Sequence, residues 1–248
     1  QRLYYSLESI GNYIMFEPNP KMKINVVQIS KERRVVVIDD FYKNPDEIRD
    51  LALSIDHRTE ADLIHNLPGA RGVVETAEVK DSLHKVYFQL CKLYFGHFEE
   101  KRFNEHWDNQ EFMVNVLNDE TLLRTPVGII PHQDHFKMQD GPGYQFGSVV
   151  YLNTEEECAG GTNMYSHMGN LSIENDYTPQ WLEDANVGDI NFDYVKSKVD
   201  GGRPYACEYE AKMAYNRMVL YQADTLHGQN VDLGMFSDYN RINQVLFM

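Results

Sequence analysis

The chain has 248 residues, 42% of them hydrophobic, and a formal net charge of −15 at pH 7. A chain of this length can bury one sizeable core, so we expect a single domain over residues 1–248. The negative charge argues against a nucleic-acid-binding surface, because phosphate recognition relies on clustered lysine and arginine.

The three cysteines and the lengths of the apolar segments further restrict the class of protein to which the chain can belong. Cys91, Cys158 and Cys207 form neither a disulfide framework nor a zinc-like spacing. No stretch approaches the about twenty apolar residues that a membrane span requires, and no signal-peptide pattern opens the chain. These features predict a cytoplasmic enzyme without a membrane partner.

The N-terminal third of the chain begins with a strand and a helix. Val35–Phe41 is a β-branched run typical of a buried strand. Asn44 is a favourable N-cap, Pro45 suits the first helical turn, and Glu47 can complete a capping box with Asn44. We predict a helix from about residue 45 to about residue 56. Its apolar face comprises Ile48, Leu51, Ala52 and Ile55.

A second helix is predicted from about Lys80 to about Arg102. Its apolar face repeats every three or four positions. The residues of this face are Leu83, Val86, Tyr87, Leu90, Tyr94 and His97. We expect it to pack against the outer side of a sheet, so that residues 1–111 support residues 112–248.

Residues 112–248 contain the predicted strands. Apolar, β-branched or alternating runs are found at Phe112–Leu117, Pro126–Ile130, Phe146–Leu152, Asn163–His167, Arg217–Gln222 and Arg241–Met248. Glycines and prolines interrupt residues 171–215, which we interpret as an insertion with a short strand near 187–194 and a short helix near 205–215. This insertion is either a substrate lid or a structural elaboration.

Side chains suited to metal binding follow the second of these runs. In an extended segment residues i and i+2 point to the same side, so His132 and Asp134 can bind one metal ion while Gln133 faces away. His227, five residues after a predicted strand, can provide a third ligand. Two histidines and one carboxylate leave positions open on a six-coordinate ion, which suits non-haem Fe(II) chemistry. By the same alternation Arg241 and Asn243 share one face of the last strand.

The ordered motifs resemble the Fe(II)/2-oxoglutarate-dependent dioxygenase superfamily, and within it the prolyl-4-hydroxylase-like branch. Over residues 112–248 the resemblance rests on His132-x-Asp134, Val149–Asn153 with Gly160–Thr162, Arg217–Tyr221 leading to His227, and Arg241. It implies a mainly β fold, a double-stranded β-helix or jelly roll, with N-terminal supporting helices. Two features depart from the family: the His227–Arg241 spacing is longer than usual, and Asn243 stands where several relatives have serine.

The resemblance also implies an activity. His132, Asp134 and His227 would bind Fe(II), with 2-oxoglutarate and O2 as cosubstrates, and the reaction would hydroxylate an amino-acid, peptide-linked or small biosynthetic substrate. The arginine fork of Arg241 is suited to the distal carboxylate of 2-oxoglutarate. Further candidates for cosubstrate contact are Asn243, Tyr151 and Asn115.

Plainer interpretations remain open for individual residues. Tyr151 can be a core aromatic residue, and Asn115 can bond neighbouring backbone. His135 and His167 are weaker candidates for substrate contact. Two other classes also stay open: a cupin-type metal enzyme that does not use 2-oxoglutarate, and a catalytically silent barrel that acts as a binding protein.

Overall fold

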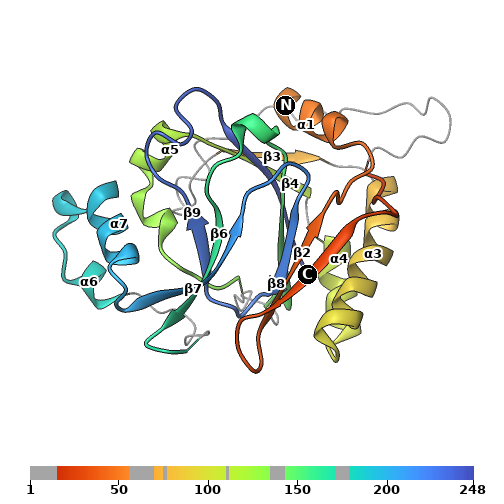
Figure 1. Ribbon diagram of the computed structural model, residues 1–248, viewed down its shortest axis with the longest axis horizontal. Helices are drawn as coiled ribbons and strands as arrows, with labels where there is room; N and C mark the ends of the chain where they lie inside the picture. Colours follow the sequence, from red (N-terminus) through yellow and green to blue (C-terminus); the bar gives the residue numbers. More distant parts are fainter. Residues whose placement is uncertain (1–15, 56–69, 75–76, 110–111, 135–142, 171–178) are drawn as a thin grey trace.

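Two antiparallel sheets and the helices around them make up the described part of the protein (Figure 1). The computed structural model describes residues 16–55, 70–74, 77–109, 112–134, 143–170 and 179–248. The strands are β1 (Lys23–Gln28), β2 (Arg34–Asp39), β3 (Ala70–Val74), β4 (Phe112–Leu117), β5 (Phe146–Tyr151), β6 (Gly161–His167), β7 (Tyr205–Lys212), β8 (Met218–Gln222), β9 (His227–Asn230) and β10 (Arg241–Phe247). The helices are α1 (Pro45–Ser54), α3 (Ala77–Phe95), α4 (Glu100–Asn109), α5 (Asp119–Arg124), α6 (Gln180–Glu183) and α7 (Phe192–Asp200), with 3-10 turns η1 (Pro126–Ile129), η2 (Glu155–Glu157) and η3 (Val187–Asp189).

The order of the strands shows how the chain moves between the sheets. The larger sheet has the order β1-β2-β8-β5-β10-β4-β3 and the smaller one β7-β6-β9. The chain leaves the larger sheet after β5, forms β6 and β7 in the smaller sheet, and returns as β8. It then adds β9 to the smaller sheet before it ends with β10 between β4 and β5.

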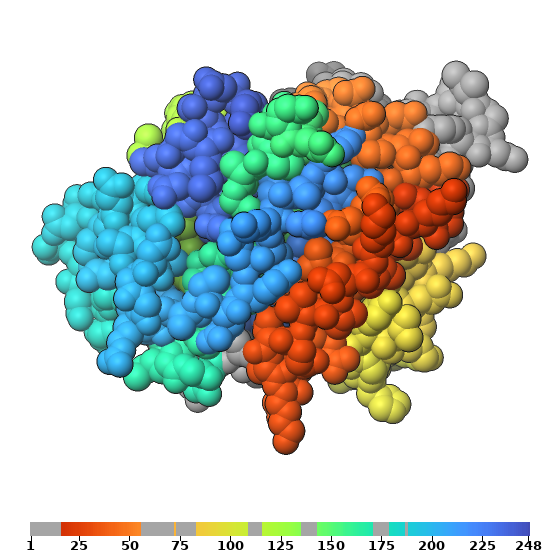
Figure 2. Space-filling model, in the orientation of Figure 1, coloured from red at the N-terminus to blue at the C-terminus, as the bar shows by residue number. Residues whose placement is uncertain are grey.

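Each face of the larger sheet is covered by a hydrophobic core. Successive side chains of a strand point to opposite faces, and β8 shows this directly. Met218 and Leu220 pack with α1, α3 and α4, whereas Val219 and Tyr221 pack with the smaller sheet and α7. Helices α3 and α4 lie at one end of the view and α6 and α7 at the other, and the space-filling view shows the same separation (Figures 1 and 2).

Most of the predicted strands are confirmed. The runs that begin at residues 112, 146 and 163 correspond to β4, β5 and β6, and those that begin at 217 and 241 correspond to β8 and β10. The predicted strand at Val35–Phe41 is β2. Strands β1 and β3 were not predicted; β1 lies at the edge of the larger sheet, where most of its side chains are exposed.

The predicted strand at Pro126–Ile130 is wrong, because this segment forms the 3-10 turn η1. The N–H groups of Gly128 and Ile130 bond to the carbonyl groups of Thr125 and Val127, three residues earlier in each case. Pro126 has a restricted φ and no N–H group, which suits the first position of such a turn. A short apolar run does not by itself distinguish a strand from a buried turn.

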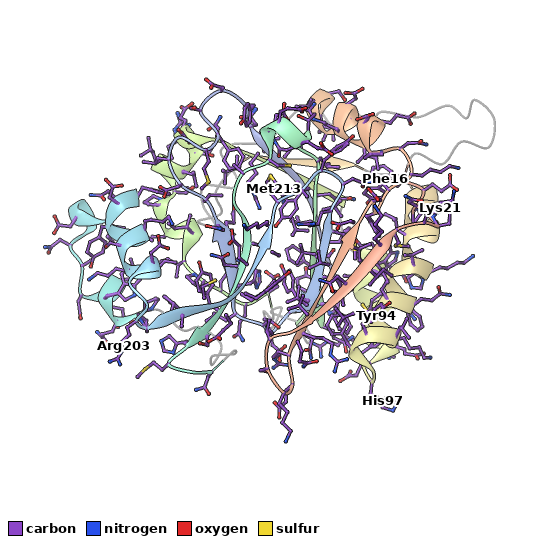
Figure 3. The ribbon with its side chains drawn as sticks, in the orientation of Figure 1. Phe16, Lys21, Tyr94, His97, Arg203 and Met213 are labelled. Carbon is purple, nitrogen blue, oxygen red and sulfur yellow. The ribbon has the colours of Figure 1, made fainter. Side chains whose placement is uncertain are left out.

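The N-terminal helices differ from the prediction in their ends. The helix predicted over residues 80–102 is divided into α3 and α4 at Gly96, whose φ of +81° ends a right-handed helix. Leu83, Tyr87 and Leu90 are buried as expected, whereas His97 is exposed beyond α3 (Figure 3). Helix α1 begins at Pro45 as predicted, but Asn44 makes no side-chain capping hydrogen bond, because its backbone (φ −127°, ψ 70°) is not extended.

The strand and the helix predicted within residues 171–215 are both wrong. The expected strand near 187–194 is the turn η3 followed by the start of α7, whose Asn191 side chain accepts a hydrogen bond from Tyr194 N at 2.9 Å. The expected helix near 205–215 is β7, which pairs with β6 from Gly161 opposite Lys212 to His167 opposite Tyr205. Long-range pairing here overrides the local helix propensity of alanine, glutamate and lysine. Residues 205–212 therefore belong to the smaller sheet, and residues 171–178 lie outside the described part.

Of the helices in the described residues, none combines the length and apolar character needed to cross a bilayer.

Candidate metal centre

Backbone hydrogen bonds bring the two parts of the predicted metal site together. His132 N donates to His227 O at 2.8 Å, and His227 N donates to His132 O at 2.9 Å. Asp134 N donates to Ala223 O at 2.8 Å. The segment around His132 is thus extended and pairs with the start of β9, although it is not part of a longer strand. These hydrogen bonds join backbone atoms only. The backbone therefore brings the three residues together without help from interactions between their side chains.

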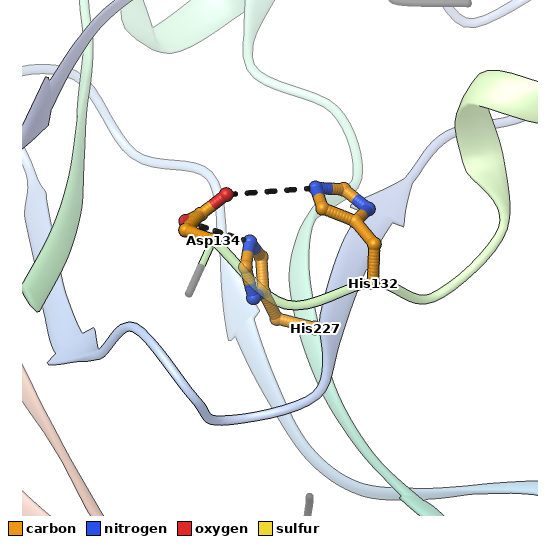
Figure 4. A group of neighbouring side chains, drawn as sticks. All are labelled: His132, Asp134 and His227. Atoms are coloured by element: carbon orange, nitrogen blue, oxygen red, sulfur yellow. Dashed lines mark ion pairs between the residues drawn. The ribbon is translucent and has the colours of Figure 1, made fainter. Parts of the chain in front are cut away.

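The side chains of His132, Asp134 and His227 converge on one point (Figure 4). One ligand atom from each residue lies within 4.8 Å of the others. His132 Nε2 is 3.9 Å from Asp134 Oδ1, and His227 Nε2 is 3.3 Å from Asp134 Oδ2. His132 retains 38% of its side-chain exposure, while the other two side chains are buried, so solvent reaches the group from the side of His132.

Hydrogen bonds from the far side of each imidazole select the tautomer that can bind a metal ion. His132 Nδ1 is 3.1 Å from Ile130 O, and His227 Nδ1 is 2.9 Å from Thr225 O. A carbonyl oxygen only accepts, so Nδ1 carries a proton in both rings, and in the neutral form of each imidazole Nε2 has the free electron pair. Such bonds to the second ring nitrogen are typical of metal-binding histidines.

The charges within the group favour an ionised carboxylate. Burial by itself raises the pKa of a carboxyl group. The positive charges of His227 and His132, when protonated, and the hydrogen bonds from His227 and Tyr221 together outweigh burial and lower the pKa of Asp134. Conversely, burial lowers the pKa of His227, whereas the Asp134 carboxylate raises it above its ordinary value. Asp134 is therefore negatively charged at neutral pH, as a metal ligand must be.

A second polar group surrounds Arg241 at the start of β10. Arg241 is buried, with a residue exposure of 3%, and burial lowers its pKa. Its Nη1 donates to Asn243 Oδ1 at 3.0 Å and to Gln229 Oε1 at 3.1 Å, and its carbon Cζ lies 5.5 Å from the ring centre of Tyr151. Among the described residues its hydrogen bonds go to amide oxygens and no carboxylate forms an ion pair with it, and its Nε has no hydrogen-bond partner. A buried cation without an anion is unfavourable, so this arrangement suits an anionic ligand.

The long loop between β9 and β10 does not displace Arg241 from the interior. Asn153, at the end of β5, accepts a hydrogen bond from Ile242 N at 2.7 Å and donates one to Asn240 O at 2.8 Å. It therefore holds the backbone on both sides of Arg241. Phe236 of the loop is buried in the core between the sheets.

The other predicted cosubstrate contacts have different outcomes. Asn243 and Tyr151 face each other across β10 and β5, and both are buried. The Tyr151 hydroxyl lies 2.6 Å from Thr162 Oγ1, so it already has a partner within the smaller sheet. The backbone of Asn115 pairs with that of Asn243, but its side chain lies outside the described part of the protein.

Only one of the two weaker histidine candidates, His167, lies in the described part of the protein. His167 contacts the ring of Tyr205 with 5.6 Å between ring centres, and in the described residues it is not part of the cluster that could hold a metal ion. His135 lies outside the described residues.

Comparison with known proteins places the chain in a family. Residues 20–239, most of the chain, match the group described as "Family of unknown function (DUF6445)". The chain belongs to this family. No curated protein matches this DUF6445 chain.

Two solved structures match this DUF6445 chain with low similarity. They are an N-substituted L-amino acid dioxygenase from Burkholderia ambifaria AMMD and the same dioxygenase in complex with alpha-KG. They are 14% and 13% identical to the chain, with TM-scores of 0.39 and 0.37, and each match covers 86% of this chain and 81% of the other. Because both TM-scores lie below 0.5, the activity of that dioxygenase is not transferred to the DUF6445 chain.

Two residues of the metal group were not predicted from the sequence of this DUF6445 chain. The hydroxyl of Tyr221, on β8, lies 3.1 Å from both Asp134 Oδ2 and His227 Nε2. Gly147, opposite Tyr221 on β5, leaves the space that the carboxylate occupies, since an added Cβ atom would lie 2.7 Å from Asp134 Oδ2. Both residues lie within strands that were predicted, but the hydrophobic pattern does not distinguish them from core residues.

We expect Gly147→Ala to disturb the metal group. The new methyl group would also approach Tyr221 Cε2 at 2.8 Å, so at least one of the two side chains must move. Overpacking of this kind destabilises by about 1–3 kcal/mol, and displaced ligands should weaken metal binding by roughly tenfold or more. Calorimetric titration with Mn(II) and thermal unfolding measure the two effects.

Gly188→Ala is the matched control, because nothing lies within 4 Å of the position that its Cβ would take. Equal Mn(II) affinity in both variants and in the wild type would contradict the placement of Gly147 against a ligand.

Proposed function

We propose that this protein is an Fe(II)- and 2-oxoglutarate-dependent oxygenase that hydroxylates a small-molecule, amino-acid or peptide-linked substrate. The observation that carries the proposal is the buried Arg241, which has no carboxylate partner among the described residues and faces the same interior as His132, Asp134 and His227. A metal group alone suits many reactions. A metal group that shares its interior with a buried guanidinium, which has no anion among the described residues, favours a reactant with a carboxylate.

His132, Asp134 and His227 would hold the ferrous ion. Two neutral imidazoles and one carboxylate, with the remaining positions open, match the donor set of non-haem Fe(II) oxygenases. When bound, Fe(II) supplies the activation of O2, with conversion of 2-oxoglutarate to succinate and CO2 and insertion of one oxygen atom into a C–H bond of the substrate. The partly exposed His132 marks the side from which reactants would approach.

Arg241 would bind the distal carboxylate of 2-oxoglutarate. Gly147, beside Asp134, and Tyr151, beneath Arg241, share the inner face of β5 and are about 13 Å apart along the strand. A long arginine side chain and a short dicarboxylate can span this distance together. The inner residue Val245 of β10 remains half-buried although its neighbours Gln244 and Leu246 are buried, which is consistent with accessible space between the two groups.

The winding of the chain supports a distorted jelly roll as the scaffold. From β5 to β10 the chain passes repeatedly between two facing sheets, with β5, β8 and β10 in the larger and β6, β7 and β9 in the smaller, as in jelly-roll proteins. The extended segment around His132, which follows η1, would take the place of a strand of the roll, since among the described residues His132 forms the bridge with β9. A cupin-type enzyme without 2-oxoglutarate would not need a buried Arg241 that lacks an anion in the described part of the chain, and a silent barrel would not need three convergent ligands.

An anaerobic titration tests the proposal. Fe(II) is added first and 2-oxoglutarate second, and we expect a weak visible absorption band from the chelate. Glutarate, which has the same two carboxylates but no keto group, should give no band. Failure to bind Fe(II) would contradict the metal centre, whereas Fe(II) binding without the band would contradict the use of 2-oxoglutarate and favour the cupin-type alternative.

A further inference from the structure

Tyr221 contributes a fourth polar group to the candidate metal centre. Its ring is buried on the inner face of β8 and lies 4.4 Å from the His227 ring, centre to centre. Its hydroxyl lies 3.1 Å from Asp134 Oδ2 and 3.1 Å from His227 Nε2. The two atoms that it contacts thus belong to two different candidate ligand residues.

The hydroxyl has one proton for these two acceptors. Asp134 is a carboxylate, and neutral His227 has its free electron pair on Nε2, because Nδ1 carries the proton that is hydrogen-bonded to Thr225 O. A metal ion bound to His227 would use the electron pair of Nε2. The Tyr221 hydroxyl would then donate only to Asp134 Oδ2, so metal binding and the Tyr221–Asp134 hydrogen bond favour each other.

Packing alone does not account for a tyrosine at this position. A phenylalanine would fill the same part of the core between the sheets, and the hydroxyl group makes both of its described hydrogen bonds to the metal group. Other buried tyrosines use the hydroxyl elsewhere: that of Tyr87 accepts from Ser148 Oγ at 3.2 Å on the opposite face of the larger sheet.

We propose that Tyr221 is a positioning residue that makes Asp134 a one-oxygen ligand. This inference rests on the proposed metal centre. With Oδ2 held by the hydroxyl of Tyr221, Oδ1 is the oxygen offered to the metal. Two histidines and one carboxylate oxygen leave three positions of a six-coordinate ion open, whereas a chelating carboxylate would leave two. Tyr221 therefore determines whether a two-oxygen cosubstrate and O2 fit on the metal together.

Tyr221→Phe tests the role of the hydroxyl, with Tyr87→Phe as the control for loss of a buried hydroxyl. Co(II) is titrated into each protein, and the affinity and visible absorption spectrum are recorded. We expect Tyr221→Phe to weaken Co(II) binding by roughly ten- to a hundredfold, as for other residues that orient metal ligands. Its spectrum should also change, because a released carboxylate alters the coordination number. Tyr87→Phe should match the wild type in both readouts.

The outcomes separate the two proposals. A wild type that binds no Co(II) would overturn the metal centre and this inference with it. A wild type that binds Co(II), with the same affinity and spectrum in Tyr221→Phe, would overturn the inference and leave the metal centre intact.

The wild type offers a second test that does not depend on the folding of a variant. A carboxylate bound through one oxygen separates its symmetric and antisymmetric infrared stretches more widely than a chelating carboxylate. We expect the wide separation when Co(II) binds to protein with 13C-labelled aspartate. The narrow separation would overturn the role of Tyr221.

Discussion

His227→Ala is expected to abolish tight binding of Fe(II) while the protein stays folded. Structural four-ligand zinc sites bind with about 10–16 kcal/mol, so one ligand accounts for about 3 kcal/mol or more, which is roughly a hundredfold or more in affinity. The bridge between the segment of His132 and β9 uses backbone atoms of His227, so alanine retains it. Metal content after dialysis and circular dichroism of the variant measure the two expectations.

His97→Ala is the matched control, since it removes an exposed histidine beyond α3 and should bind Fe(II) as the wild type does (Figure 3). Full iron occupancy of His227→Ala would show that His227 is an ordinary core histidine.

Arg241→Ala is expected to raise the apparent KM for 2-oxoglutarate by roughly ten- to a hundredfold, because a charge-assisted hydrogen bond contributes about 1.5–3 kcal/mol. Fe(II) affinity should stay nearly unchanged, since none of the contacts of Arg241 involves the three candidate ligands. Arg241→Lys should recover only part of the loss, because lysine has no planar fork. Succinate release at varied 2-oxoglutarate concentration measures the effect.

A thermal-shift measurement adds a readout that does not require a substrate. 2-Oxoglutarate should raise the unfolding temperature of the wild type, because ligands stabilise the folded state that they bind, and this increase should disappear in Arg241→Ala.

Arg217→Ala is the control for the loss of an arginine. The Arg217 side chain pairs with Asp39 and bonds the carbonyl of Lys212, so it is already engaged. Arg203 is a less suitable alternative to Arg241, because it is exposed at the turn before β7, at the edge of the molecule (Figure 3). If 2-oxoglutarate still stabilised Arg241→Ala but no longer stabilised Arg217→Ala, Arg217 and not Arg241 would be the residue that binds its carboxylate.

Strand periodicity explains which parts of the site could be predicted. Because side chains alternate along extended backbone, His132 and Asp134 were expected on one side, and so were Arg241 and Asn243. The structure agrees: the first two converge with His227, and Arg241 donates to Asn243. Strands β5 and β8, apolar on both faces, were recognisable as β-branched runs.

The incorrect elements share a physical cause. Pro126–Ile130 and residues 205–212 have local preferences that suit more than one structure. Tertiary context selects between them: β6 pairs with β7, and the backbone around Thr125 closes into η1. Likewise, the sequence pattern shows Tyr221 only as a core aromatic residue and Gly147 only as a strand glycine. The tertiary structure places the carboxylate of Asp134 against both of them.

The sequence by itself determined which side chains can bind a metal ion and a carboxylate, and on which face of its own segment each lies, because these properties depend on residue type and on a two-residue repeat. Only the tertiary structure decided that His227 lies beside His132, that Tyr221 contacts Asp134, and that Arg241 is buried without an anion among the described residues. These relations join residues far apart in the chain, so they depend on how the sheets pair and pack and not on any local pattern.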